Sequence, residues 1–346
     1  MWIPCLVSST TASGEVTVRV GHELVDDYLH FLAGRSRPNS VLAAGYDLKV
    51  FFAWSAKEPA EVRSRDVVNF VAAQRSPRTS GKVVRLVDGG AGLSSRTVAR
   101  RLSSLSGFYA YLLARGDVGV TTSPVPRGLE TRRGRRNNGR AAPLVRTPKL
   151  LPRILEPAAV NQLIAALRTA RDRAMVEAMV LGGLRRCEVL GLRLEDLRVG
   201  QRRVLIAEGK GGHQRIIPVS SRFFTTVAAY LDAERPVPVD TERVFLVLKG
   251  QTRGRPLSAS GLDQILESAR ERAGLSHASC HELRHTCLTR LREAGMALEA
   301  VQAQAGHASI ETTRLYLHLA DDWLAGEYRR ASEAIDAQSL AARSGS

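Results

Sequence analysis

The sequence predicts a mainly α-helical protein of two domains, the second of which also carries a small antiparallel β-sheet. Three observations lead to this prediction. The chain has 346 residues, which is enough for two domains of roughly 100–200 residues each. Apolar residues recur at helical spacing through most of both halves. In the second half, two short apolar runs separated by a glycine-rich turn have the pattern of a β-hairpin.

The first domain is expected at residues 22–126, after an N-terminal extension at 1–21. It should be a group of packed helices, because its apolar residues recur every three or four positions, as in the final helix from 98 to 112. The stretch 76–95 is rich in Gly, Ser and charged residues. It is therefore predicted to be a long loop between two helices.

Residues 127–152 have no hydrophobic periodicity and are predicted to form a basic linker. They hold seven Arg and one Lys against a single Glu, and Pro and Gly interrupt them. Such a segment can lie along a phosphate backbone, or it can simply be solvated.

The second domain is expected at 153–335, followed by a tail at 336–346. Its strands are predicted at 204–207 and 215–219, on either side of a turn that contains Lys210 between glycines. The helices predicted around this hairpin are 157–168, 171–181, 186–191, further helices after Ser258, and an amphipathic segment at 327–340.

The chain is strongly basic, with 50 Lys and Arg against 34 Asp and Glu and a formal net charge of +16. Of the basic residues 44 are Arg, whose planar guanidinium group matches two phosphate oxygens at once. Codon bias in a GC-rich genome can explain the preference for Arg over Lys, but it does not explain the excess of positive charge. The composition therefore favours a polyanionic partner, of which nucleic acid is the obvious one.

Neither a membrane anchor nor a disulfide framework is indicated. No stretch of about 18 uncharged apolar residues is present. The first residues lack the basic start and apolar run of a secretory signal, which favours the cytoplasm. The cysteines show no C-x-x-C pair and are expected to be reduced thiols: Cys5, Cys187, Cys280 and Cys287.

Five short patches carry residue types suited to phosphate chemistry. In chain order they contain Arg185 within G-L-R-R-C-E, Lys210 within G-K-G, His281 and Arg284 within H-E-L-R-H, His307 within G-H, and Tyr316 nine positions later. Each patch alone is a weak signal. In this order and at this spacing they resemble the tyrosine recombinases, the lambda-integrase-like family of DNA strand-exchange enzymes.

The resemblance extends to the first half, where the run S-x-T-x-x-R-R-L-S-x-L-x-x-F-Y from Ser95 to Tyr109 is similar to the family's core-binding domain. It implies a SAM-like helical first domain, a recombinase catalytic second domain, and cutting and rejoining of double-stranded DNA through a 3′-phosphotyrosine intermediate. It also implies a homotetramer on two DNA sites, with a related recombinase or accessory protein as a possible further partner. The segment 327–340 could then dock on a neighbouring subunit or fold onto its own domain.

The matched residues suit the breaking of a phosphodiester bond. Tyr316 can supply the nucleophile, and Arg185 and Arg284 can neutralise the charge that builds on the phosphoryl oxygens. Because Arg284 lies three positions after His281, both side chains should share one face of a helix. No metal ion or other cofactor is needed, since the guanidinium groups supply the positive charge.

Four further residues are assigned supporting roles. His281 can accept or steer the proton of the tyrosine, and His307 can donate a hydrogen bond to the phosphate. Lys210 can protonate the departing 5′ oxygen. Glu188 lies one turn after Arg185, where it can either orient that guanidinium group or cap the helix.

One rival site lies within these patches. The sequence from His281 to His285 also satisfies H-E-x-x-H, the zinc-protease pattern. Arg284 inside the motif would place positive charge beside the metal, and a peptidase has no use for a large excess of Arg. The zinc site is therefore disfavoured, and His285 is expected to be structural.

Several biological roles agree with the resemblance. The few residues before His22 favour a two-domain, Xer-like or transposon-encoded enzyme. The long loop at 76–95 and the linker at 127–152 favour an integrase or transposase of a mobile element over Xer-type dimer resolution. The remaining alternatives are a type IB topoisomerase and a non-catalytic DNA-binding protein.

Overall fold

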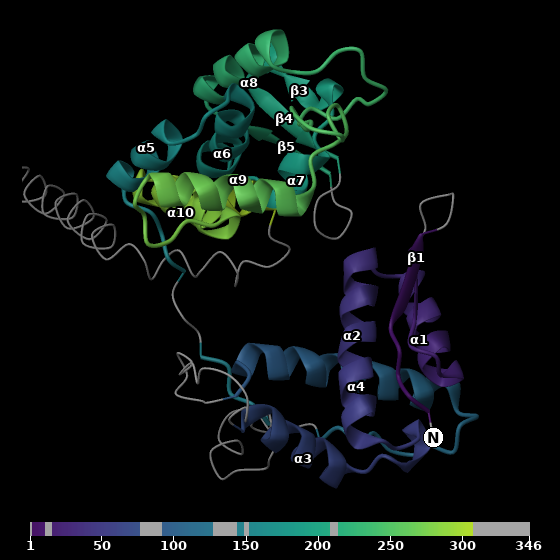
Figure 1. The fold of residues 1–346 in the computed structure, drawn as a ribbon. Coiled ribbons are helices and arrows are strands. Elements are labelled where there is room, and N and C mark those ends of the chain that lie inside the picture. Colours follow the sequence, from purple (N-terminus) through teal and green to yellow (C-terminus); the bar gives the residue numbers. More distant parts are fainter. Residues whose placement is uncertain are drawn as a thin grey trace, which may run out of the picture. The chain divides into compact units, whose positions relative to one another are not determined.

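The computed structural model describes residues 2–10, 16–76, 92–126, 144–148, 152–207 and 214–306. The chain divides into two compact units, Met1–Lys149 and Leu150–Ser346. Each unit has its own hydrophobic core, and Figure 1 shows the helices and strands of both units.

In the residues that the structure describes, the regular elements of the first unit are helices and one hairpin near its start. Its helices are α1 (Glu23–Ala33), α2 (Pro38–Ser55), α3 (Ser64–Arg75) and α4 (Ser95–Arg115), with a 3-10 turn at Pro59–Glu61. Ser94 begins α4 by accepting a hydrogen bond from the amide of Thr97 at 3.2 Å, and Gly116 ends it with a left-handed backbone at φ 78°. The core between the helices is aromatic, with edge-to-face contacts among Phe51, Phe52, Phe70 and Phe108.

Strands β1 (Val7–Thr10) and β2 (Val16–Arg19) form an antiparallel hairpin in residues for which the sequence predicts only an extension. Val18 is 5% exposed and packs into the core of the unit. Gly45 of α2 permits this approach, because a Cβ there would lie 2.9 Å from Val18 Cγ1. The sequence does not reveal this hairpin, because β1 (V-S-S-T) has a single apolar residue and so shows neither an apolar run nor an alternation.

The second unit combines helices with a small antiparallel sheet in the order β3-β4-β5. The strands are β3 (Leu197–Arg198), β4 (Arg203–Ile206) and β5 (Arg215–Pro218), and the 3-10 turns Leu194–Asp196 and Val199–Gln201 flank β3. The helices are α5 (Pro157–Ala165), α6 (Ala170–Gly182), α7 (Arg186–Gly191), α8 (Ser221–Ala233), α9 (Ala259–Arg272), α10 (Cys280–Glu293) and α11 (Leu298–Ala305).

Helix α6 lies at the centre of the second unit, packed between α8 and α10 (Figure 1). Apolar side chains cover most of its surface, and Met175, Val176 and Met179 are fully buried. A helix that is apolar on most sides has to be enclosed by its neighbours. Its buried Glu177 is paired with Arg222 of α8, with 2.8 Å between Oε1 and Nε. The candidate site lies at the C-terminal end of this enclosed helix.

The predicted fold class is confirmed, because the described residues are mostly helical with small antiparallel sheets. The predicted strands at 204–207 and 215–219 agree with β4 and β5 to within one residue. The sequence does not predict the two-residue β3. The segment 327–340 lies outside the described residues.

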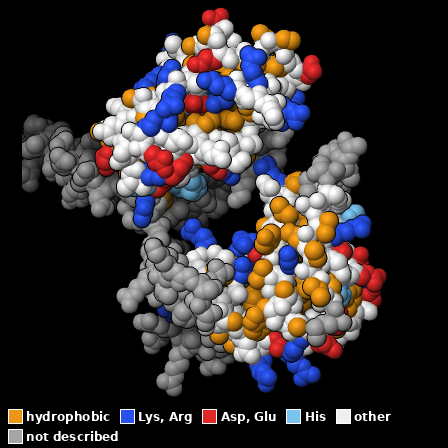
Figure 2. All heavy atoms as spheres, viewed as in Figure 1, with side chains coloured by type: hydrophobic (Ala, Val, Ile, Leu, Met, Phe, Trp, Pro, Cys, Tyr) orange, Lys and Arg blue, Asp and Glu red, His pale blue; other side chains and the backbone are white. Residues whose placement is uncertain are grey.

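Basic side chains are prominent on the second unit. Figure 2 shows Lys and Arg side chains spread over its visible face, while apolar side chains gather along the visible face of the first unit. The exposed large apolar residues of the first unit include Phe31, Tyr46, Trp54 and Val68. Among the described helices, none combines the length and the apolar character needed to cross a membrane.

Candidate active site

The junction between α6 and α7 places Arg185. Gly183 ends α6 with φ 69°, a conformation that favours glycine, and its amide donates to the carbonyl of Met179 at 3.1 Å. A Cβ on Gly183 would lie 3.3 Å from Leu288 of α10, so the turn is pressed against that helix. The chain then turns at Arg185, which is the N-cap residue of α7.

Glu188 binds Arg185 through both of its carboxylate oxygens. Oε1 accepts from Nη1 of Arg185 at 2.7 Å, and Oε2 accepts from the Arg185 amide at 2.9 Å. Glu188 therefore caps α7 and also hydrogen-bonds the guanidinium group of Arg185, so both predicted contacts are present, while its role in the reaction stays a prediction. The Glu188 side chain is 0% exposed and that of Arg185 is 20% exposed.

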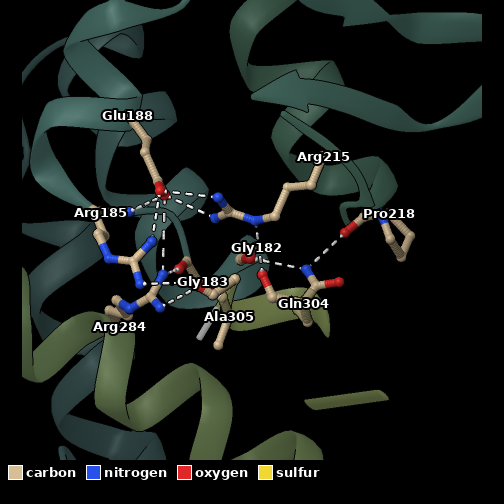
Figure 3. A network of polar contacts seen from close by, with 10 residues as sticks. Gly182, Gly183, Arg185, Glu188, Arg215, Pro218, Arg284, Gln304 and Ala305 are labelled. Carbon is tan, nitrogen blue, oxygen red and sulfur yellow. Dashed lines mark hydrogen bonds and ion pairs between the residues drawn. The ribbon is translucent and has the colours of Figure 1, made fainter. Parts of the chain in front are cut away.

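Arg284 of α10 reaches the same place from a distant part of the sequence. It is 3% exposed, and its Nη2 donates to the carbonyl of Ala305 at 2.6 Å. Its Nη1 donates to the carbonyl of Gly183 and lies 3.9 Å from Oε2 of Glu188. Figure 3 shows these contacts converging between the end of α6, the start of α7 and the end of α11.

Arg215, at the start of β5, is a member of this cluster that the sequence does not predict. Its Nη1 and Nη2 bind Oε1 and Oε2 of Glu188 at 3.0 and 2.9 Å, and its Nε donates to the carbonyl of Gln304 at 3.3 Å. One signal is present in the sequence: an Arg opens the second strand of the hairpin that carries Lys210. That signal does not identify a partner, because Arg203 opens β4 in the same way and is exposed.

Three guanidinium groups thus surround one buried carboxylate, which leaves an excess of positive charge at the site. Burial alone would raise the pKa of Glu188. The hydrogen bonds and positive charges of Arg215 and Arg185 outweigh burial and lower that pKa to about 2. The carboxylate is therefore ionised at neutral pH, and the cluster has the charge and the donors to bind an anion such as a phosphate group.

The two histidines of H-E-x-x-H contact each other directly. Nε2 of His281 and Nε2 of His285 are 2.8 Å apart, so one nitrogen donates and the other accepts. Burial, followed by the charges of His281 and Arg284, lowers the pKa of His285 to about 4. Within the described ranges, no group of three or more His, Cys, Asp or Glu side chains is placed to hold a metal ion.

The structure brings together Arg185, Glu188 and Arg284 and places the exposed His281 on the helix that carries Arg284. Lys210, His307 and Tyr316 lie outside the described residues, so their roles stay predictions.

Comparisons with known proteins show what the chain is similar to. The model of the phage integrase family matches residues 153–322, and that of the phage integrase N-terminal SAM-like domain matches residues 25–116. A tyrosine recombinase XerC from Pelobacter propionicus is 30% identical, over 85% of this chain and 89% of that protein. A tyrosine recombinase XerD from Listeria innocua is 29% identical, over 86% of this chain and 94% of that protein.

Two solved structures share the fold. One is the XerH site-specific recombinase bound to a palindromic difH substrate, with a TM-score of 0.62 and 20% identity, over 86% of this chain and 81% of that one. The other is the Tn1549 transposon integrase in complex with transposon right end DNA, with a TM-score of 0.63 and 17% identity, over 90% of this chain and 100% of that one.

Proposed function

Because the chain belongs to the phage integrase family of tyrosine recombinases, which are enzymes that cut and rejoin DNA, we propose that it recombines DNA sites for a mobile element. The observation that carries the chemical part of the proposal is the convergence of Arg185, Arg215 and Arg284 on Glu188. A site built from guanidinium groups can stabilise the charge of a phosphoryl group in transfer.

In the proposed reaction the phenolate oxygen of Tyr316 attacks the scissile phosphorus in line. The bond from phosphorus to the 5′ oxygen breaks, which leaves a 3′-phosphotyrosine and a free 5′ hydroxyl. His281 takes or steers the proton of the phenol, and Lys210 gives a proton to the departing oxygen. Attack by the 5′ hydroxyl of another strand reverses these steps and releases the tyrosine.

Arg185 and Arg284 are assigned to the non-bridging oxygens of the phosphate, and His307 donates a further hydrogen bond to it. The buried contacts of Arg284 with Ala305 and Glu188 hold its guanidinium group in the cluster, so this group is oriented before DNA binds. The scheme uses no metal ion or other cofactor, since the guanidinium groups neutralise the developing charge.

Double-stranded DNA is the proposed partner, bound by a homotetramer that holds two sites. The net charge of +16 supports the choice of a polyanion. A recombinase has to reach the DNA of a chromosome or element, so we expect it to act in the cytoplasm. The segment 327–340 is proposed to dock on a neighbouring subunit. Truncation after Asp322 should then leave DNA binding intact and abolish recombination, whereas an undiminished yield would remove this part of the proposal.

The mobile-element role is supported by the sequence, which predicts a long loop at 76–95 and a basic linker at 127–152 and so departs from a compact Xer layout. A second candidate role is the resolution of chromosome dimers, which the similarity to proteins named XerC and XerD favours. Recombination of sites from the DNA that flanks the gene would support the first role. Recombination confined to a single chromosomal site would support the second.

A paired assay tests the proposed function against relaxation by a type IB topoisomerase. One plasmid carries two copies of a candidate site taken from the DNA that flanks the gene, and a matched supercoiled plasmid carries none. We expect deletion or inversion on the first plasmid and little relaxation of the second. Relaxation of both plasmids without recombination would contradict the proposal.

A further inference from the structure

Arg215 is placed to control what Arg185 can do. We infer that Arg215 is a positioning residue, which occupies Glu188 so that Arg185 stays available to the phosphate and which holds the backbone that leads into His307. This inference rests on the proposed function and adds a residue to its site. It is carried by the contacts of Arg215 with Glu188, Gln304 and Gly306.

The carboxylate of Glu188 is shared between Arg185 and Arg215. Each of its oxygens accepts one bond from Arg185 and one from Arg215, at distances between 2.7 and 3.0 Å. A carboxylate has about four lone-pair sites, so these bonds fill it. The guanidinium group of Arg215 binds the Glu188 carboxylate through two nitrogens, Nη1 and Nη2. The guanidinium group of Arg185 binds it through Nη1 only.

This distribution determines how firmly Glu188 holds Arg185. Without Arg215, the freed lone pairs of Glu188 would attract a second nitrogen of Arg185 and draw its guanidinium group into a two-pronged pair. An arginine held in that way has fewer donors to offer a phosphate. Arg215 therefore keeps Arg185 oriented by Glu188 without letting Glu188 consume its donors.

Arg215 also contacts the end of α11. Gly306 has φ 59°, and a Cβ there would lie 2.9 Å from Cζ, Nε and Nη1 of Arg215. The guanidinium group thus lies against the backbone of Gly306, while its Nε donates to the carbonyl of Gln304 at 3.3 Å. Arg185 also donates to the carbonyl of Gly306, at 3.2 Å. Removal of Arg215 would loosen the backbone at Gly306, the residue that precedes His307 in the sequence.

The positive charge of Arg215 also affects the protonation of Glu188. Burial opposes the ionised form of Glu188, and the hydrogen bonds and charge of Arg215 are among the contributions that lower its pKa to about 2. Loss of Arg215 leaves burial less opposed, so the pKa of Glu188 should rise. Protonated Glu188 would no longer orient Arg185 as an ion pair. Cleavage by such a variant should therefore become sensitive to mild acid.

The chain offers a matched control for a purely structural effect. Glu177 is also a buried carboxylate, 2% exposed, and its arginine partner is Arg222, with 2.8 Å between the paired atoms. Arg222→Met removes a cation from a buried carboxylate of the same unit without touching Glu188. A loss that reflects stability alone should be similar in Arg222→Met and Arg215→Met.

The experiment measures covalent protein–DNA adduct in a single turnover, across pH, with full-length protein and nicked duplexes tiled across the DNA that flanks the gene. The variants are Arg215→Met, Arg215→Lys, Arg215→Met with Glu188→Gln, and Arg222→Met. For Arg215→Met we expect an adduct rate ~10–100-fold lower, with DNA affinity little changed. We also expect the loss of rate toward acid pH to begin at a higher pH than in wild type, partial rescue by Arg215→Lys, and no such shift in the double variant.

Two results would overturn the inference. One is a wild-type rate and pH profile for Arg215→Met, and the other is an equal change in Arg222→Met. If wild type forms no adduct on any duplex, the proposed function fails instead. An acid titration of folding stability still decides whether Arg215 keeps Glu188 ionised, because a higher pKa of Glu188 in folded Arg215→Met should make its loss of stability between pH 4.5 and 2 smaller than that of wild type, and an equal loss would overturn the inference.

Discussion

Arg185 and Arg284 donate hydrogen bonds to consecutive carbonyls, those of Gly306 at 3.2 Å and Ala305 at 2.6 Å. Two arginines from separate helices are thereby fixed at one point of the backbone, immediately before the position of His307 in the sequence. Both also lie at Glu188, where Arg215 completes the cluster (Figure 3). This convergence is the physical basis of the phosphate site proposed here.

Glu188→Gln should reduce the acid dependence of folding stability. The pKa of Glu188 is lowered in the folded protein from an ordinary value of 4.5 to about 2. Its contribution to stability is therefore present above pH 4.5 and is lost as the pH falls toward 2, and it amounts to about 3 kcal/mol. Urea unfolding of wild type and variant across this range measures it. Identical pH slopes in both proteins would contradict the assignment.

His285→Gln should change the pH dependence in a different window. The pKa of His285 is lowered from 6.5 to about 4, because burial and then the charges of His281 and Arg284 oppose its protonation. The unfolded chain therefore binds the proton more readily, and stability falls as the pH drops from 6.5 toward 4. Glutamine cannot take up that proton, so the variant should lose less stability across this window. Urea unfolding at several pH values measures this difference. An equal loss of stability in both proteins across this window would argue against a neutral His285.

Gly306→Ala should impair DNA cleavage more than folding. A Cβ at this position meets the guanidinium group of Arg215 at 2.9 Å, in addition to the strain of a left-handed backbone. Gly250 is a matched control, because it has φ 83° and a Cβ added there would meet no atom within 4 Å. Both alanine variants should lose about 1 kcal/mol of stability from the backbone conformation. Only Gly306→Ala should slow adduct formation, and equal rates in both would contradict this role of Gly306.

In the first unit, Asp47→Asn should destabilise the fold more than Asp27→Asn. Both carboxylates lie 2.6 Å from an arginine Nη1, of Arg100 and Arg115 respectively. The Asp47 side chain is 2% exposed and that of Asp27 is 44% exposed. We expect a loss of about 2 kcal/mol for Asp47→Asn and less than about 1 kcal/mol for Asp27→Asn. Thermal or urea unfolding compares them, and equal losses would show that burial does not decide the strength of these pairs.

Helices and apolar strand runs are the parts of the fold that the sequence predicts well, as with α7 at 186–191. The strands β4 and β5 are predicted to within one residue because Lys210 and its glycines separate two clear apolar runs. The hairpin β1–β2 is not predicted because β1 (V-S-S-T) has a single apolar residue and therefore no apolar run to mark a strand. Arg215 is not predicted because a single arginine in a chain with 44 of them gives no sign of its partner. Its contact with Glu188 depends on tertiary packing.

The measurement that tests the account most directly is the identification of the residue that becomes linked to DNA. Wild-type protein is incubated with a nicked duplex that it binds, the adduct is digested, and the modified peptide is sequenced by mass spectrometry. The account predicts a phosphodiester on Tyr316, loss of the adduct in Tyr316→Phe, and DNA affinity unchanged in that variant. An adduct on another residue, or one that persists in Tyr316→Phe, would contradict it.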